Sequence, residues 1–395
     1  MHFIKKIEKV QKFLQISSMD GWLLYDFQGK NKLACQFLEI PENTLLSRRF
    51  FYWIPKTGKP LQIVHGVEAH TLDHLPGDKE IYVQWEALES CLKNSVKNCK
   101  KVAMEFSRHN AIPYISQVDA GTVDLVRSFG VEVVSSGEFL SHFTAVLSEF
   151  QLKLHLEAAD VLDKTAQATW LFIRDSLNKK VPLTEYLVQQ FMFKKITESG
   201  CIMKGLPFCA VNANSANPHY TPSSQMSAEI KQGDFVLIDL WCKKNVKEAV
   251  YADITRLGVV GRKPFPKEQE VFNIVSQAQK AATEFIRTQY ASHQTIKGCE
   301  ADRVCRKVIE EAGYGAYFIH RTGHNIYTDD HGPGAHLDSF ETLDERPLIP
   351  ETCFSIEPGI YLPGEFGIRL EYDVYLYADR TIQVTGGVQD RLYEI

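Results

Sequence analysis

The sequence lacks the features that define several large classes of protein. No run of apolar residues reaches 18, about the length that a transmembrane helix needs. Basic residues are not in excess, because 49 Asp and Glu outnumber 44 Lys and Arg, which excludes nucleic-acid binding by bulk positive charge. The nine cysteines form no CxxC pair and are odd in number, which favours reduced thiols. We therefore expect a cytoplasmic protein with neither a membrane nor a nucleic-acid partner.

The chain also lacks a low-complexity linker, but its pattern changes near residue 150. Upstream, short apolar runs alternate with helical patterns, which predicts an α/β domain over residues 1–150. The expected strands there are Trp22–Tyr25, Phe50–Ile54, Leu61–His65, Ile81–Trp85, Val102–Phe106 and Val131–Val134, and the expected helices are Phe3–Ile16, Glu86–Lys97 and Ile115–Phe129.

Downstream, residues 151–395 predict a second domain of class α+β. Amphipathic helices are expected over 152–177, after a Thr184 cap, over 271–286, and over 301–312 before Gly313. Strands are expected over 235–241, 249–260, 353–360 and 367–377.

Four carboxylates lie inside runs that otherwise read as buried strands. They are Asp239 in FVLIDLW, Asp253 in AVYADITRLGVV, Glu357 in CFSIEPGI and Glu371 in GIRLEYDVYLY. A buried carboxylate without a counter-charge is unfavourable, and the nearby Arg256 and Arg369 are too few to neutralise four. One such acid would be explained by exposure or an ion pair. Four together predict bound divalent cations.

The positions of these acids along their strands support a shared site. Asp253 has the same parity as Tyr251 and Thr255, and Glu371 the same parity as Arg369 and Asp373, so each set shares one face of its strand. The short polar stretch 242–248 predicts a hairpin that places Asp239 beside Asp253.

A histidine segment, residues 320–336, reads HRTGHNIYTDDHGPGAH and contains His320, His324, His331 and His336. The zinc motif HExxH is absent, because Arg321 stands in the place of the Glu and Gly323 disfavours a helix. His320 and His324 would share a face if this segment were a strand. Single histidines are usually structural, but this clustering beside glycine-rich turns predicts a functional site.

One imidazole with four carboxylates is a hard, oxygen-rich ligand set that suits Mn(II), Co(II), Fe(II) or Zn(II). Five protein ligands exceed the need of one open catalytic metal, so two bridging acids could hold two metals about 3.5–4 Å apart. Such a pair lowers the pKa of a water and polarises a carbonyl. The predicted chemistry is metal-assisted hydrolysis.

The order Asp, Asp, His, Glu, Glu resembles the creatinase, prolidase and methionine aminopeptidase superfamily. The resemblance rests on VLIDL…YADITR, HxxGH…H, SIEPGIY and RLE over 152–395. It implies a pita-bread catalytic domain over 151–395, preceded over 1–150 by a smaller α/β domain that resembles that of creatinase and aminopeptidase P. The two-domain length and SIEPGIY favour the Xaa-Pro peptidases over the methionine aminopeptidases.

The resemblance also implies the ligands of two divalent metals, for which manganese is the first expectation and Co, Zn or Fe are alternatives. Asp239 would bind one metal, and His324 and Glu357 the other. Asp253 and Glu371 would bridge both. Glu357 would also be the proton shuttle.

Further residues would contact the substrate or orient the ligands. His219, His320 and His331 would line the pocket and bond the scissile carbonyl or the tetrahedral intermediate. Arg369 would orient an Asp ligand, and Tyr327 would form part of the pocket wall. The implied partners are a peptide with proline at its second position and a second copy of the chain, as a homodimer.

The sequence departs from the family pattern around the metal-binding histidine. Gly323-His324-Asn325-Ile326-Tyr327 stands where the family usually has GHGxG, so two glycines are replaced by bulkier residues. Gly332 follows His331 where the family usually has an acid. The stretch between Asp239 and Asp253 is also longer than usual, which the hairpin can absorb.

The leading hypothesis is a dinuclear metallo-exopeptidase, an Xaa-Pro aminopeptidase or Xaa-Pro dipeptidase. One alternative is a metal-free C–N hydrolase, as in the creatinase branch, which has lost ligands that this chain retains. The other is a non-catalytic peptide-binding module on the same fold, which the substitutions Asn325 and Tyr327 leave open.

Overall fold

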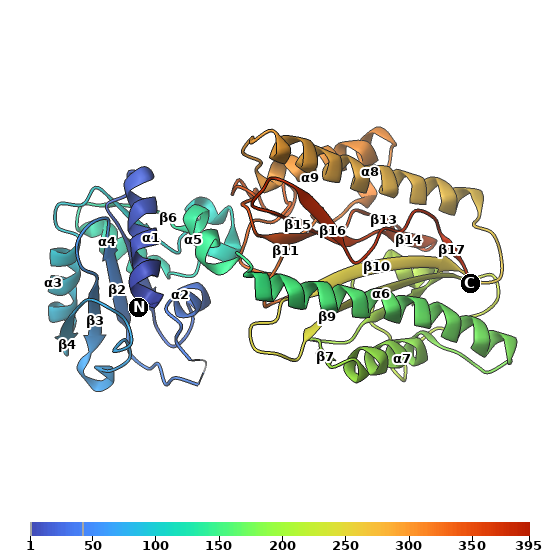
Figure 1. Cartoon of the computed structure of the whole chain (residues 1–395), viewed down its shortest axis with the longest axis horizontal. Coiled ribbons are helices and arrows are strands. Elements are labelled where there is room, and N and C mark those ends of the chain that lie inside the picture. The colour runs from blue at the N-terminus through green and yellow to red at the C-terminus, as the bar shows by residue number, and fades with distance from the viewer. Residues whose placement is uncertain (1, 42) are drawn as a thin grey trace. The chain divides into compact units, whose positions relative to one another are not determined.

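The computed structural model describes residues 2–41 and 43–395, and the chain divides into two compact units, Met1–Thr144 and Ala145–Ile395. We call them the N-terminal unit and the C-terminal unit and describe each by itself (Figure 1). Within the described residues, no helix combines the length and the apolar character that a membrane span requires.

The N-terminal unit contains a six-stranded sheet. Its strands are β1 Gly21–Asp26, β2 Phe50–Pro55, β3 Leu61–His65, β4 Asp78–Tyr82, β5 Lys101–Met104 and β6 Glu132–Ser135. Its helices are α1 His2–Ile16, α2 Lys32–Phe37, α3 Trp85–Ser95, α4 Ala120–Ser128 and α5 Gly137–Thr144. The strand order is β4-β3-β2-β1-β5-β6, and β1 runs antiparallel to β2 but parallel to β5.

Helices cover both faces of this sheet, as strand β1 illustrates. Trp22 and Leu24 pack with α1, α2 and α5, whereas Leu23 and Tyr25 pack with α3 and α4, because successive side chains point to opposite faces. Every residue of β1 is buried, so its sequence is a continuous apolar run rather than an alternating one.

The C-terminal unit contains longer helices and three sheets. Its helices are α6 Glu149–Asn178, α7 Glu185–Glu198, α8 Pro266–Ala291 and α9 Gly298–Glu311. Its strands are β7 Cys201–Ile202, β8 Phe208–Val211, β9 Phe235–Lys244, β10 Ala252–Val259, β11 Asn325–Ile326, β12 Cys353–Ile356, β13 Gly359–Leu362, β14 Phe366–Arg369, β15 Tyr372–Leu376, β16 Ile382–Thr385 and β17 Tyr393–Glu394. The sheet orders are β17-β10-β9-β7 with β8 on β9, β11-β12-β15-β16, and β13-β14.

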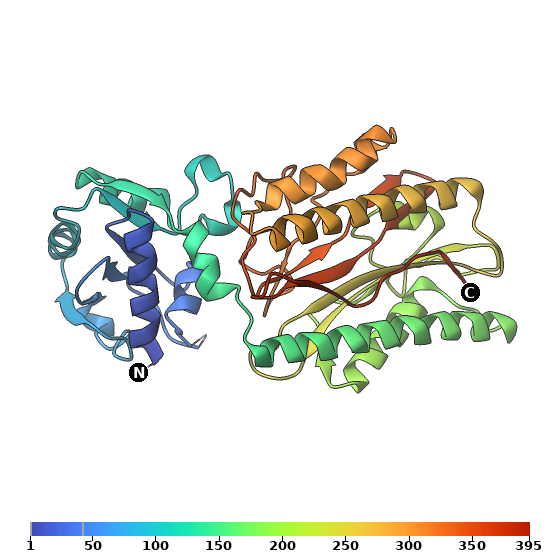
Figure 2. The same ribbon diagram turned by 45° about the horizontal axis from the view of Figure 1, so that its top comes forward.

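Two pairs of helices enclose these strands. Figures 1 and 2 show α8 and α9 on one side and α6 and α7 on the other. Strand β9 faces both layers, since Phe235 and Leu237 join the core under α8 and α9, whereas Val236 and Ile238 join the core under α6 and α7. Asp239 lies on the same face of β9 as Phe235 and Leu237. It therefore occupies a position that the pattern would give to an apolar residue.

The long hairpin near the C-terminus is interrupted in the middle. Pairs β12–β15 and β13–β14 keep one common register, which in a continuous ladder would place Glu357 directly opposite Glu371. Both acids instead lie between strands, and Pro358 has no N–H to offer a ladder. The continuous strands predicted over 353–360 and 367–377 are therefore wrong at their centres.

Other predicted elements differ at their ends. The strand predicted at 81–85 lies at Asp78–Tyr82, and the helix predicted to begin at Ile115 begins at Ala120, because the Asp119 carboxylate caps it by accepting a bond from the N–H of Thr122. Helices α2 and α5 were not predicted. Thr184 caps α7 as predicted.

The buried carboxylate of Glu185, at the start of α7, holds the loop that follows β8. It accepts hydrogen bonds from the N–H groups of Val211 and Ala228 (both 2.7 Å), from the Asn214 amide (2.9 Å) and from the Tyr220 hydroxyl (2.6 Å). Glu185 has no exposed surface. Both oxygens of this buried carboxylate are therefore satisfied by hydrogen bonds.

Replacing Glu185 by Ala should therefore destabilise the fold strongly. The substitution leaves four donors without their acceptor, and we expect the free energy of unfolding in urea to fall by about 3 kcal/mol. Glu198→Ala, on the exposed end of the same helix, should change it by less than about 0.5 kcal/mol. Equal stability of the two variants would contradict this role for Glu185.

Candidate metal centre

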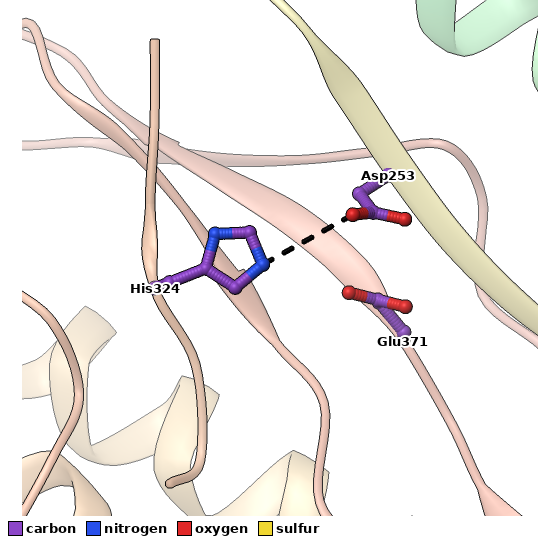
Figure 3. A group of neighbouring side chains, drawn as sticks. All are labelled: Asp253, His324 and Glu371. Atoms are coloured by element: carbon purple, nitrogen blue, oxygen red, sulfur yellow. Dashed lines mark ion pairs between the residues drawn. The ribbon is translucent and has the colours of Figure 1, made fainter. Parts of the chain in front are cut away.

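Three buried side chains from distant parts of the sequence converge in the C-terminal unit. Asp253 comes from β10, His324 from the segment before β11, and Glu371 from the gap between β14 and β15. Each offers one ligand atom, and these atoms all lie within 4.8 Å of one another. Figure 3 shows the imidazole and both carboxylates turned toward a common point. This group has the composition of a metal site.

The orientation of His324 leaves one ring nitrogen available as a ligand. Its Nδ1 lies 3.3 Å from the carbonyl oxygen of Asn325, so Nδ1 carries the hydrogen and Nε2 has a free lone pair. Nε2 lies 3.3 Å from Glu357 Oε1 and 4.0 Å from Asp253 Oδ2. Burial, and then the neighbouring His331, lower the pKa of His324 well below its usual value. A neutral nitrogen facing carboxylate oxygens needs a cation between them.

Asp239 joins this group through the β9–β10 pairing. It lies opposite Thr255 and two positions from the partner of Asp253, so both acids share one face, as the hairpin prediction requires. Arg369 donates to Asp239 Oδ2 and, at 3.0 Å, to the Thr255 hydroxyl oxygen. The same hydroxyl lies 2.7 Å from Glu371 Oε2. Thr255 and Arg369 therefore link the carboxylates of Asp239 and Glu371.

Glu357 is tied to the histidine segment by its neighbour Ser355. The Ser355 hydroxyl accepts a bond from the N–H of His324 (3.0 Å) and donates to Glu357 Oε1 (3.2 Å). The backbone N–H of Glu357 donates to the carbonyl of Thr322 (2.7 Å). These bonds fix His324 and Glu357 relative to each other.

The acids of the group are strongly desolvated and repel one another. Burial, followed by the charges of the neighbouring acids, raises the pKa of Asp253 and of Glu371 well above its usual value. Burial also raises the pKa of Glu357 to about 7. Within the described residues, the buried oxygens Asp253 Oδ1 and Asp373 Oδ1 have no hydrogen-bond partner. Divalent cations would supply the missing charge and the missing partners, so the residues fit such ions.

The remaining histidines of the prediction have different environments. His320 Nδ1 donates to the carbonyl of Arg321 (2.7 Å), so Nε2 accepts from the Tyr361 hydroxyl at 2.8 Å. Arg369 in turn donates to that hydroxyl oxygen at 3.0 Å. Burial and then Arg369 lower the pKa of His320 to about 3. Both nitrogens of His320 are engaged, and its contact with the ligand set runs through Tyr361 and Arg369.

His331 and His219 are exposed. The ring of His331 lies against that of His324, with centroids 4.2 Å apart. Arg369 donates to the carbonyl of Pro218 at 3.4 Å, which brings the backbone beside His219 to the group. Tyr327 lies among apolar residues that include Trp241.

The histidine segment has little regular secondary structure and is held by two buried aspartates, Asp302 and Asp344, while a third, Asp338, orders the turn that follows it. Asp302, on α9, accepts bonds from the N–H and hydroxyl groups of Thr322 and Ser339. Asp344 accepts from the N–H of residue 336, and Asp338 accepts from three successive N–H groups after it. None of the three has exposed surface. The strand considered for this segment is reduced to β11 and one bridge between residues 323 and 337.

Asn325 explains two departures from the family pattern at once. Its side chain donates to the carbonyl of Cys353 (2.8 Å) and accepts from the N–H of Gly334 (2.9 Å). A Cβ on Gly332 would lie 2.3 Å from the Asn325 side-chain oxygen and 2.7 Å from the Cβ of Tyr327. The bulk added at 325 and 327 therefore occupies the space that a side chain on residue 332 would need.

Sequence reasoning missed Thr255, Ser355 and Tyr361 as partners of the ligands. Parity contained a signal for the first two, because each lies two residues from an acid on the same face of its strand. Tyr361 gave no such signal, since its contact with His320 joins segments that are 41 residues apart in sequence.

Comparisons with known proteins agree with this geometry. The sequence model of metallopeptidase family M24 matches residues 153–378. An Xaa-Pro dipeptidase of Lactobacillus delbrueckii subsp. lactis is 29% identical over 235 residues, which cover 59% of this chain and 58% of the relative. The prolidase of Thermococcus sibiricus superposes with a TM-score of 0.65 at 23% identity over 100% of both chains. An X-Pro aminopeptidase of Thermotoga maritima gives 0.58 at 22% identity, over 97% of this chain and 100% of the other. These structures share its fold, the predicted pita-bread arrangement.

The raised pKa of Glu357 predicts a pH-dependent stability for the metal-free protein. The folded state holds this proton more tightly than the unfolded state, so its stabilising contribution is complete below about pH 4.5 and is lost as the pH rises through about 7. Relative to Glu357→Gln, the wild type should lose about 3 kcal/mol of unfolding free energy between these values. Urea titrations of both proteins across this range, after chelation, measure the difference. A pH-independent difference would contradict the raised pKa.

Proposed function

The chain belongs to metallopeptidase family M24, and from that premise we propose that it is a dinuclear metal-dependent exopeptidase that cleaves between an N-terminal residue and proline. The observation that carries this proposal is the convergence of one neutral imidazole, that of His324, with a group of buried carboxylates. Arg369 is bonded to a single one of these acids, Asp239. A metal-free C–N hydrolase of the creatinase kind would have no use for this complete ligand set.

The ligand assignment is the one that the family resemblance implies. Asp253 and Glu371 lie in one group with His324 and are proposed to bridge the two ions. His324 and Glu357 would complete one coordination sphere, since Nε2 and Oε1 are 3.3 Å apart. Asp239 would belong to the other, oriented by Arg369. When bound, the metals supply Lewis-acid activation of a water and of the scissile carbonyl.

The protein groups around the ligands would handle protons and orient the peptide. Glu357, which Ser355 holds beside His324, would take a proton from the attacking water and return it to the leaving nitrogen. His331, exposed beside His324, is placed to donate to a substrate carbonyl. His320 would act indirectly, by holding Tyr361 and through it Arg369.

The charges near His331 favour a dipeptide as substrate. Arg321 Nη2 lies 3.3 Å from His331 Nδ1. Desolvation, and then the charge of Arg321, lower the pKa of His331, with Lys204 adding to this effect and Asp330 opposing it. Lys204 is exposed. A cationic rim attracts the free carboxylate of an Xaa-Pro dipeptide, whereas the continuing chain of a longer peptide has no charge at that position. We therefore propose Xaa-Pro dipeptidase activity ahead of aminopeptidase activity.

Removing a bridging carboxylate tests the metal assignment. We expect about two divalent ions per wild-type chain by metal analysis, and loss of Xaa-Pro hydrolysis in EDTA. Asp253→Asn should lose at least one ion per chain and nearly all turnover, because a neutral amide is a much weaker bridging ligand. Asp160→Asn, the same change at an exposed position on α6, should behave as wild type. Hydrolysis that persists without metal would favour the creatinase-like alternative, and metal binding without hydrolysis the binding module.

A matched peptide panel tests the substrate class. Ala-Pro should have a kcat/KM at least about tenfold above Ala-Pro-amide and Ala-Pro-Ala, a difference of about 1.4 kcal/mol. Lys204→Met should raise KM for Ala-Pro and leave the value for Ala-Pro-amide unchanged. Faster cleavage of the longer peptides would identify an aminopeptidase instead.

A further inference from the structure

The interrupted hairpin leaves the carbonyl of Leu370 without a ladder partner, because the opposite residue, Pro358, has no N–H. Ile356, in contrast, still pairs with Tyr372. Ile356 is the last residue of β12, and Leu370 follows the last residue of β14, so each immediately precedes a proposed ligand, Glu357 or Glu371. Both are buried, and a buried carbonyl without a hydrogen bond is unfavourable. The positions of the two acids therefore depend on what these carbonyls contact.

One side chain, Gln279 of α8, contacts both carbonyls. Its Nε2 donates to the oxygen of Ile356 at 2.9 Å and to the oxygen of Leu370 at 3.0 Å. Because both partners only accept hydrogen bonds, the amide must present its NH₂ group to them, which fixes its orientation. The two hydrogens of one amide thus join the two chain segments that carry the acids.

The location of Gln279 shows that it does not serve the packing of α8. It lies on the buried face of the helix, among Phe272, Val275, Ala282 and Ile286, all of which belong to the apolar core. Gln279 is only 3% exposed. Burying an amide there is unfavourable unless its hydrogen bonds are made, and an apolar residue would fill the same position on packing grounds alone.

Within the gap the N–H of Leu370 still donates to the carbonyl of Pro358 (3.3 Å), but two other backbone groups are bonded from outside the hairpin. The N–H of Glu357 donates to Thr322, and the carbonyl of Glu371 accepts from Arg256 at 2.7 Å. Each acid is therefore held on one side by a neighbouring segment and on the other by Gln279, which contacts both segments.

We propose that Gln279 is a positioning residue for the metal centre, which sets the separation of Glu357 and Glu371 by bonding the carbonyl that precedes each of them. This inference rests on the proposed function, because it takes the two acids as metal ligands. Gln279 acts through the backbone and touches neither metal nor substrate.

The test compares metal affinity with stability in matched variants. Gln279→Leu keeps the size of the side chain but cannot donate, and Gln279→Glu keeps its shape and provides a single donor only when protonated. Gln277→Leu makes the first change at an exposed position on the same helix. Val275→Ala removes apolar contacts from the same buried face and no hydrogen bond.

Mn²⁺ affinity is measured by competition with a chelator, well below the melting temperature of every variant. Gln279→Leu should bind Mn²⁺ 10–100-fold more weakly than wild type, in the range found when partners of metal ligands are removed, and Gln279→Glu should also bind more weakly. Gln277→Leu and Val275→Ala should stay within about twofold, although Val275→Ala melts at a lower temperature.

A second measurement does not depend on metal. Hydrogen exchange of residues 353–360 and 366–376 in the metal-free protein should be faster in Gln279→Glu than in Val275→Ala. Wild-type affinity in both Gln279 variants, or an equal loss in Val275→Ala, would overturn the inference. A wild-type protein that binds no Mn²⁺ would instead refute the proposed function, and the exchange comparison would still decide whether Gln279 positions these segments.

Discussion

The C-terminal unit is organised around the repulsion between carboxylates buried in one small volume. The strand register would place Glu357 directly opposite Glu371, and like charges directly opposite each other destabilise a ladder. The strands part at this point, and Pro358 prevents the pairing from continuing. The bonds lost there are replaced from outside by Gln279, Arg256 and the histidine segment. The break in the sheet and the convergence of the ligands are thus the same feature.

A second consequence is that the site depends on residues that are neither proposed metal ligands nor proposed catalytic residues. The histidine segment is irregular, so the position of His324 is set by Ser355 and by the buried Asp302 and Asp344 rather than by a strand or a helix, and the buried Asp338 orders the turn that follows. Each of these aspartates accepts several hydrogen bonds from neighbouring backbone and hydroxyl groups. Such satisfied carboxylates make an irregular loop rigid enough to present a ligand.

The sequence allowed the fold class and the ligand types to be predicted, because both depend on local patterns. An acid in an apolar run such as FVLIDLW is visible without a structure, and Thr184 is a recognisable helix cap. The strand break at Glu357 had a local signal in Pro358, which the prediction overlooked, whereas the break at Glu371 could not be predicted, since local propensity continues through it. The role of Gln279 also could not, because a glutamine in an amphipathic helix is indistinguishable from a surface residue until its carbonyl partners, 77 and 91 residues away, are known.

The contact of Gly332 with Asn325 and Tyr327 also bears on how this chain diverged from its family. The family pattern has glycine at the positions of Asn325 and Tyr327 and an acid at that of Gly332. In this chain residues 325 and 327 carry the larger side chains, and residue 332 carries none. The two states cannot be mixed freely, because any side chain at 332 would overlap both neighbours. A side chain restored at residue 332 alone would therefore displace the Asn325 amide from the N–H of Gly334, so residues 325, 327 and 332 are constrained to change together.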